Sequence, residues 1–220
     1  AQDWLDLARY ADTTGHAADQ PRTMWLYRDW VIDALNTDMP YDQFTVEQLA
    51  GDRLANATES QRIATGFHRN SMQALGNNPR KEEFRVRGVV DRMDVTGQVW
   101  LGLSLACAEC HDHTHDPISQ KEYFQLYAIF NQTPHYGEKF KVRGPRLTVK
   151  RDGKEVEAQI MNTLETPRPT YIHVRGNFEA RGEQVSAKLP ALFGGGEVDR
   201  LGFARWLVSA EQPLTARVAV

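Results

Sequence analysis

The spacing of apolar residues changes near residue 137, and this change is the strongest constraint on the fold. From residue 4 to about 132, apolar side chains recur every three or four positions, which is typical of amphipathic helices. After Gly137, short runs alternate between apolar and polar residues, which indicates strands. The sequence therefore predicts a mainly α protein: a helical domain followed by a small β subdomain and a C-terminal helix.

The predicted elements follow from these two periodicities. Helices are expected over 21–35, 45–50, 58–67, 81–91, 99–108 and 119–130, with Pro21 in the first turn of the first of these. Strands are expected over 146–150, 156–160 and 170–174, with a turn at Asp152-Gly153. A Pro- and Gly-rich loop, 189–196, precedes a last helix over 199–209. The predicted domains are a helical domain at 1–135, a small β-rich extension and linker at 136–196, and the start of a following domain at 197–220.

The charge balance excludes a strongly basic or acidic binding surface. The 220 residues include 26 lysines and arginines and 29 aspartates and glutamates, which gives a formal net charge of −3. We therefore expect no nucleic-acid partner, because no strong field attracts one. The 41% hydrophobic content is enough for a core, but no apolar run reaches the roughly 18 residues of a spanning helix. We expect no membrane span in this chain.

The main chemical clue is the spacing of the chain's two cysteines. Cys107 and Cys110 are three positions apart, and His111 follows directly. Attachment of haem c needs two thiols about one turn apart to add to its two vinyl groups, and an imidazole next to them to meet the iron. The sequence therefore predicts covalent haem c bound through Cys107 and Cys110, with His111 as an axial ligand.

The second axial ligand is expected from elsewhere in the chain. His113 is too close to His111 to pass round the porphyrin edge to the opposite face. His68 is the first candidate for this distal position, Met72 is the alternative, and Met93 is a further one. A methionine at helical spacing more often fills a core than binds iron.

Two other interpretations of the cysteine region remain open. His111, His113, His115 and Asp116 could form a haem-free site for a Zn or Fe ion with help from the cysteines, as in a hydrolase or lyase. Alternatively, Cys107 and Cys110 could form a plain disulfide in an interaction module.

Several blocks of the sequence resemble the planctomycete cytochrome c domain family over about residues 3–132. These blocks are Trp4–Thr13, Met24–Ile32, Gln48–Asp52, Ala64–Asn70, Trp100–Leu103 and Cys107–Tyr123. The segments Tyr171–Asn177, Arg200–Val208 and Pro213–Val218 resemble the linker and the start of the second planctomycete-specific domain that usually follows. Thr114 and His115 depart from the family pattern, which tends to have lysine and an aromatic residue there.

The resemblance implies an exported protein with a c-type haem. An extracytoplasmic location, periplasmic or exported, follows because haem c is attached outside the cytoplasm. The expected function is electron transfer, or service as the redox module of a larger enzyme. Its partner would be a redox protein or associated domains of the same larger chain, and both ends of the sequence are expected to continue into such a chain.

Overall fold

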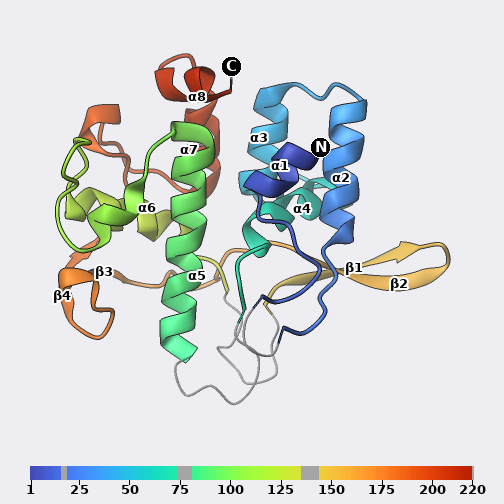
Figure 1. Cartoon of the computed structure of the whole chain (residues 1–220), viewed down its shortest axis with the longest axis horizontal. Helices are drawn as coiled ribbons and strands as arrows, with labels where there is room; N and C mark the ends of the chain where they lie inside the picture. The colour runs from blue at the N-terminus through green and yellow to red at the C-terminus, as the bar shows by residue number, and fades with distance from the viewer. Residues whose placement is uncertain (16–18, 74–80, 135–143, 220) are drawn as a thin grey trace. The chain divides into compact units, whose positions relative to one another are not determined.

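The chain forms two compact units, each built from two separate stretches of sequence. The computed structural model describes residues 1–15, 19–73, 81–134 and 144–219. Unit 1 contains residues 1–88 and 134–163, and unit 2 contains residues 89–133 and 164–220. Figure 1 follows the chain from its blue N-terminus to its red C-terminus. Helices dominate and two small antiparallel sheets follow them, so the predicted mainly α class with a small β part is confirmed.

Unit 1 begins with a series of short helices and 3₁₀ turns. They are α1 (Gln2–Leu7), α2 (Trp25–Asn36), α3 (Tyr41–Ala50), the 3₁₀ turn η1 (Gly51–Arg53), α4 (Glu59–Ala64) and the 3₁₀ turn η2 (Thr65–Arg69). The start of α4 is stabilised by a capping box, in which Thr58 and Gln61 each bond the other's backbone N–H.

The predicted position of Pro21 in a helix is wrong. Pro21 instead pairs with Thr13 in an isolated antiparallel bridge, and α2 begins at Trp25. The backbone N–H of Arg22 donates to Asp12 O at 2.8 Å, which keeps this stretch extended. The extended pairing outweighs the helical preference of proline at a first turn.

The core of unit 1 is an aromatic cluster organised by one buried amide. Trp30 stacks on Phe44 with ring centroids 5.3 Å apart, and Trp4 meets Phe44 edge-on at 4.8 Å. The side-chain oxygen of Gln48 accepts hydrogen bonds from the Trp4 indole at 2.8 Å and the Tyr27 hydroxyl at 2.7 Å. Gln48 is buried, so these bonds satisfy groups that would otherwise be desolvated without a partner.

A β-hairpin completes unit 1 and confirms the predicted turn. Strands β1 (Arg146–Arg151) and β2 (Lys154–Gln159) pair antiparallel, and Figure 1 shows the hairpin extending from the helices. Asp152 and Gly153 both have positive φ, 49° and 74°, as a two-residue hairpin turn of the favoured primed type requires. The backbone N–H of Met161 donates to the Thr65 hydroxyl at 2.8 Å and ties the end of the hairpin to η2.

The helix predicted over 99–108 is not continuous. Helix α5 (Lys81–Thr96) passes into a π-helical turn, η3 (Gly97–Leu101), which ends at Gly102 with φ 64°. A separate 3₁₀ turn, η4 (Leu105–Glu109), follows. A Cβ on Gly97 would lie 2.7 Å from the Leu105 side chain, so this glycine allows the chain to fold back closely.

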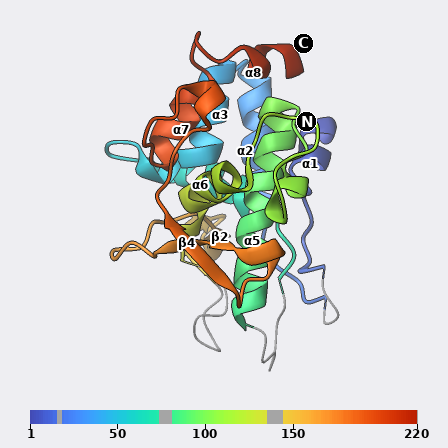
Figure 2. The same ribbon diagram turned by 90° about the vertical axis from the view of Figure 1, so that its left-hand side faces the viewer.

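The rest of unit 2 packs around one apolar helix. Helix α6 (Gln120–Asn131) contacts the strands β3 (Thr170–His173) and β4 (Arg181–Val185), and Figure 2 shows β4 just below α6. Phe124 meets His173 at 4.8 Å and Phe130 meets Phe203 at 6.0 Å. The remaining elements are the 3₁₀ turns η5 (Val174–Gly176) and η6 (Ala191–Phe193) and the helices α7 (Arg200–Leu207) and α8 (Pro213–Val218). Strand β4 and helix α8 were not predicted.

Within the described parts of the chain, no helix combines the length and apolar character needed to cross a membrane.

Candidate functional site

The two cysteines lie on the exposed side of the 3₁₀ turn η4 and the residue after it. Leu105 and Ala108 are buried and anchor this segment in unit 2. Cys107 and Cys110 are exposed, and their thiols are free rather than joined in a disulfide. Both sulfurs are therefore accessible to a reagent or a cofactor.

His111 has the tautomer that suits metal coordination. Its Nδ1 lies 2.7 Å from the backbone oxygen of Asp112. A carbonyl oxygen only accepts, so Nδ1 carries the proton and Nε2 keeps its lone pair. His111 is exposed, and this arrangement, in which the other ring nitrogen donates to a backbone carbonyl, is typical of ligating histidines.

His113 plays a different part, because both of its ring nitrogens are engaged within the loop. Nδ1 accepts hydrogen bonds from the backbone N–H groups of Asp116 at 2.8 Å and His115 at 3.2 Å. Nε2 therefore carries the proton and donates to Ser104 O at 3.1 Å. The Asp116 carboxylate lies 3.6 Å from Nδ1, but an ion pair there would need a proton on the nitrogen that the two backbone groups already occupy. His113 thus holds the loop together and has no lone pair free for a metal.

The residues of the haem-free alternative do not form a ready ligand set. His111 and His115 are exposed and Asp116 is half-buried. Among the described residues, no three His, Cys, Asp or Glu side chains gather closely enough to hold a metal ion. A metal site at this loop would require these side chains to rearrange.

The contrast between His113 and His115 leads to a stability prediction. His113→Ala removes three hydrogen bonds from a side chain that is only 5% exposed, so we expect the free energy of unfolding to fall by roughly 2 kcal/mol. His115→Ala should change it by less than about 0.5 kcal/mol, because this side chain is exposed. Urea titration followed by circular dichroism measures both. Equal effects of the two substitutions would contradict the assigned role of His113.

The start of helix α6 supports the cysteine segment. The backbone N–H of Gln120 donates to the Asp112 carboxylate at 2.8 Å. The Gln120 side-chain amide donates to Glu109 O at 2.9 Å and to His173 O at 3.3 Å, so one residue joins the motif, α6 and β3.

A capping box stabilises this helix start. Ser119 and Glu122 bond each other's backbone N–H groups. Burial raises the pKa of the Glu122 carboxyl, but hydrogen bonds from Ser119 and from the Ala191 backbone outweigh it and lower the pKa overall. Glu122 is therefore charged at neutral pH, as its capping role requires.

The turn after β3 comes very close to Cys110. Gly176 has φ 73°, and a Cβ placed on it would lie 2.7 Å from the Cys110 sulfur. The absence of a side chain at Gly176 therefore allows the thiol its present position. Arg175, the preceding residue, also has positive φ, 55°, so the turn is tightly constrained.

A buried phenol lies beneath the same segment. Tyr123 is fully buried and its hydroxyl has no hydrogen-bond partner among the described residues. Burial raises the pKa of Tyr123 well above its usual value, and the charges of Asp94 and Glu109 raise it further. Tyr123 is thus a neutral, buried group near Glu109 and Cys110.

The candidate distal ligands belong to different parts of the chain. His68 and Met72 are in unit 1, whereas the cysteine motif is in unit 2. His68 is buried and Met72 is 66% exposed, and Met93, in unit 2, is buried. The distal roles of all three stay predictions.

Sequence reasoning missed several residues that shape the site. The Ser119-x-x-Glu122 pattern is a recognisable helix-start signal and could have been found. Ser104, Gln120 and Gly176 had no such signal, because their partners depend on how the chain folds: Ser104 bonds His113 within the same loop, and Gln120 and Gly176 contact distant stretches.

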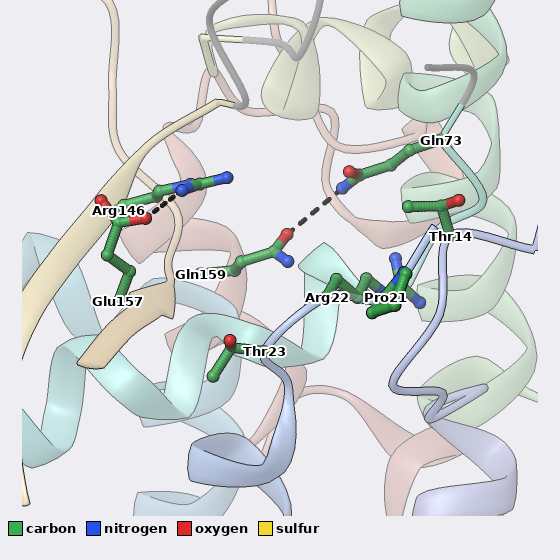
Figure 3. A pocket seen from close by; sticks show the side chains of 8 residues that line it. All are labelled: Thr14, Pro21, Arg22, Thr23, Gln73, Arg146, Glu157 and Gln159. Carbon is green, nitrogen blue, oxygen red and sulfur yellow. Dashed lines mark hydrogen bonds and ion pairs between the residues drawn. The ribbon is translucent and has the colours of Figure 1, made fainter. Parts of the chain in front are cut away.

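A polar pocket of about 100 Å³ lies in unit 1 (Figure 3). Its lining residues are Thr14, Pro21, Arg22, Thr23, Gln73, Arg146, Glu157 and Gln159. The Arg22 guanidinium donates to the backbone oxygens of Ala11, Arg69, Asn70 and Ser71 at 2.9 to 3.2 Å.

Two further pairs form between side chains that line this pocket. Gln73 donates to Gln159 at 3.3 Å, and Arg146 pairs with Glu157. Because these side chains bond one another and the backbone, the pocket is primarily a junction that joins the two stretches of unit 1.

Comparison with known proteins identifies one family. The family model PSCyt2, described as a protein of unknown function (DUF1549), matches residues 1–135, and this family is associated with planctomycetes. No curated protein and no solved structure matches the chain.

Proposed function

The chain belongs to the PSCyt2 family, and we propose that it is an exported c-type haem protein in which Cys107, Cys110 and His111 hold the haem. The observation that carries the proposal is the combination of two free, exposed thiols with an imidazole whose Nε2 lone pair is available. When bound, haem would supply one-electron redox chemistry.

The residues of the site would act in distinct ways. Each thiol would add across one vinyl group, with its sulfur bonding to one vinyl carbon and its proton passing to the other. His111 would bind iron through Nε2, oriented by its own bond to the Asp112 carbonyl. Gln120 would keep the motif in place through its bonds to Glu109 and His173.

The wider setting is part of the same proposal. Attachment of haem c implies an extracytoplasmic location, and the function would be electron transfer or the redox step of a larger enzyme. A redox protein, or further domains of a longer chain such as the second planctomycete-specific domain, would be the partner.

Expression with a periplasmic haem-maturation system tests the proposal directly. We expect haem that stays with the chain under denaturing, acid-acetone conditions and a pyridine haemochrome spectrum typical of thioether-linked haem. Cys107→Ser with Cys110→Ser should abolish this retention, because no thioether can form. His111→Ala should leave some covalent haem but change its spectrum. His115→Ala, which alters a nearby exposed histidine, should change neither the amount of retained haem nor its spectrum.

The outcome also distinguishes the alternatives. A purified chain with no Soret band and no retained haem after such expression would overturn the haem proposal. Stoichiometric zinc or iron without porphyrin would instead favour the haem-free metal site predicted from His111, His113, His115 and Asp116 with help from the cysteines, after the loop had rearranged. The plain interaction module would be favoured if neither the unaltered chain nor the double serine variant bound a cofactor and both folded equally well.

A further inference from the structure

A groove in unit 1, remote in sequence from the cysteine motif, is lined by both apolar and charged side chains. It has a volume of about 360 Å³ and is lined by residues of α2, α4 and the β1–β2 turn, all in unit 1. Trp25 and Trp30 contribute indole rings, and Leu26 and Ile63 add apolar surface. Its size lies near the lower end of the roughly 300–1,000 Å³ range of small-molecule pockets.

Helix α2 builds one wall by its own periodicity. Trp25, Asp29 and Asp33 are spaced four residues apart, so they form a row on one face of the helix. Trp30 is held from behind by its stacking on Phe44, which fixes the ring in place. The row therefore presents one aromatic ring followed by two carboxylates.

The lining carries excess negative charge. The groove is lined by four carboxylates but only one cation, Arg151; the carboxylates are those of Asp29, Asp33, Glu59 and Asp152. Arg151 pairs with Glu59 at 2.8 Å, and Arg28 pairs with Asp29 at 2.7 Å. Asp33 and Asp152 are exposed and form no ion pair within the described residues. Two carboxylates at the groove thus remain available to a ligand.

We propose that this groove binds a small organic cation, an alkylammonium or quaternary ammonium group on an apolar body. Trp25 lines the groove, and an indole ring attracts such a cation through its ring electrons, while the two carboxylates complement its charge. The apolar lining takes the hydrocarbon part. A phosphate or carboxylate ligand is disfavoured by the sign of the charge on the lining, and a bare metal ion is disfavoured because no three ligating side chains converge in the described residues.

Choline and its neutral isostere, 3,3-dimethylbutan-1-ol, test this proposal on the whole chain. The two have the same shape and differ in charge. We expect isothermal titration calorimetry or NMR titration to show choline binding about tenfold or more tighter than the alcohol. n-Butylammonium serves as a third probe and shows whether a primary ammonium is accepted as well as a quaternary one.

Two variants locate the binding. Asp33→Asn with Asp152→Asn should weaken choline binding about fivefold or more while leaving the alcohol unchanged, because only the charge is removed. Asp38→Asn is the matched control: it lies just after the same helix, is exposed and does not line the groove. Trp25→Leu should weaken choline binding as well, because it removes the ring.

Three outcomes would overturn the proposal: equal affinity for choline and the alcohol, no saturable binding of either ammonium probe, or choline binding that survives the loss of both carboxylates. Because the surface carboxylate variants do not disturb the core, a loss of binding in them would not be caused by unfolding. The result is independent of whether the cysteine motif carries haem.

Discussion

Replacing Gly51 with alanine is expected to lower the free energy of unfolding of unit 1 by about 3 kcal/mol. A Cβ at this position would overlap the backbone oxygen of Gln61, and the Gln61 α-carbon is only 3.4 Å away. These are backbone atoms of α4, whose start is already held by the Thr58–Gln61 capping box. The contact can therefore be relieved only by moving a whole helix.

The control for this substitution is Gly196→Ala. No atom lies within 4 Å of a Cβ at Gly196, and its φ is not positive, so we expect a change below about 0.5 kcal/mol. Urea unfolding measures the total change, and hydrogen exchange assigns it to unit 1. If Gly51→Ala lowers the free energy of unfolding no more than Gly196→Ala does, η1 does not approach α4 as closely as the structure shows.

A Gly176→Ala chain is expected to retain about tenfold less doubly attached haem than the unaltered chain, if the proposed attachment occurs. The new methyl group would lie 2.7 Å from the Cys110 sulfur, so the thiol must turn away from its present position. A displacement of about 1 Å at a reacting atom can cost on the order of a hundredfold in rate. Haem held by a single thioether has a distinct haemochrome spectrum, which reports the loss at Cys110.

The same substitution has a readout that does not depend on haem. In a Cys107→Ser background, Gly176→Ala should raise the rate of Cys110 alkylation by iodoacetamide, because the sulfur moves away from the turn. Gly153→Ala is the matched control, since Gly153 also has positive φ, 74°, but has open space around it. An unchanged alkylation rate, or the same rate change in the control, would contradict a steric role for Gly176.

Local signals in the sequence were sufficient for most of α2 and α6 and for one hairpin. The row of apolar residues in α2 and the Asp152-Gly153 turn each depend on neighbours within a few positions, so pattern reasoning found both. The boundaries were less accurate where a distant contact decides them. Pro21 was assigned to a helix because its pairing with Thr13 has no local signature.

In the candidate site, too, local patterns predict some residues, and distant contacts decide the roles of others. Cys107, Cys110 and His111 are recognisable from spacing alone. The different roles of His111 and His113 are not, because they depend on which carbonyls and N–H groups the folded loop brings to each ring nitrogen. The Gln120 side chain bonds Glu109 and His173, and Gly176 approaches Cys110; these contacts span more than 10 positions, and no periodicity reveals them.

The division of unit 2 between two stretches of sequence has a consequence for the order of synthesis. Cys110 emerges with the first stretch, but Gly176 and the β3 strand belong to the second. At about 5–20 residues per second, several seconds of translation separate them. During that interval the Cys110 thiol lacks the turn that later lies against it, so one side of the sulfur is closed only after residue 176 has been synthesised.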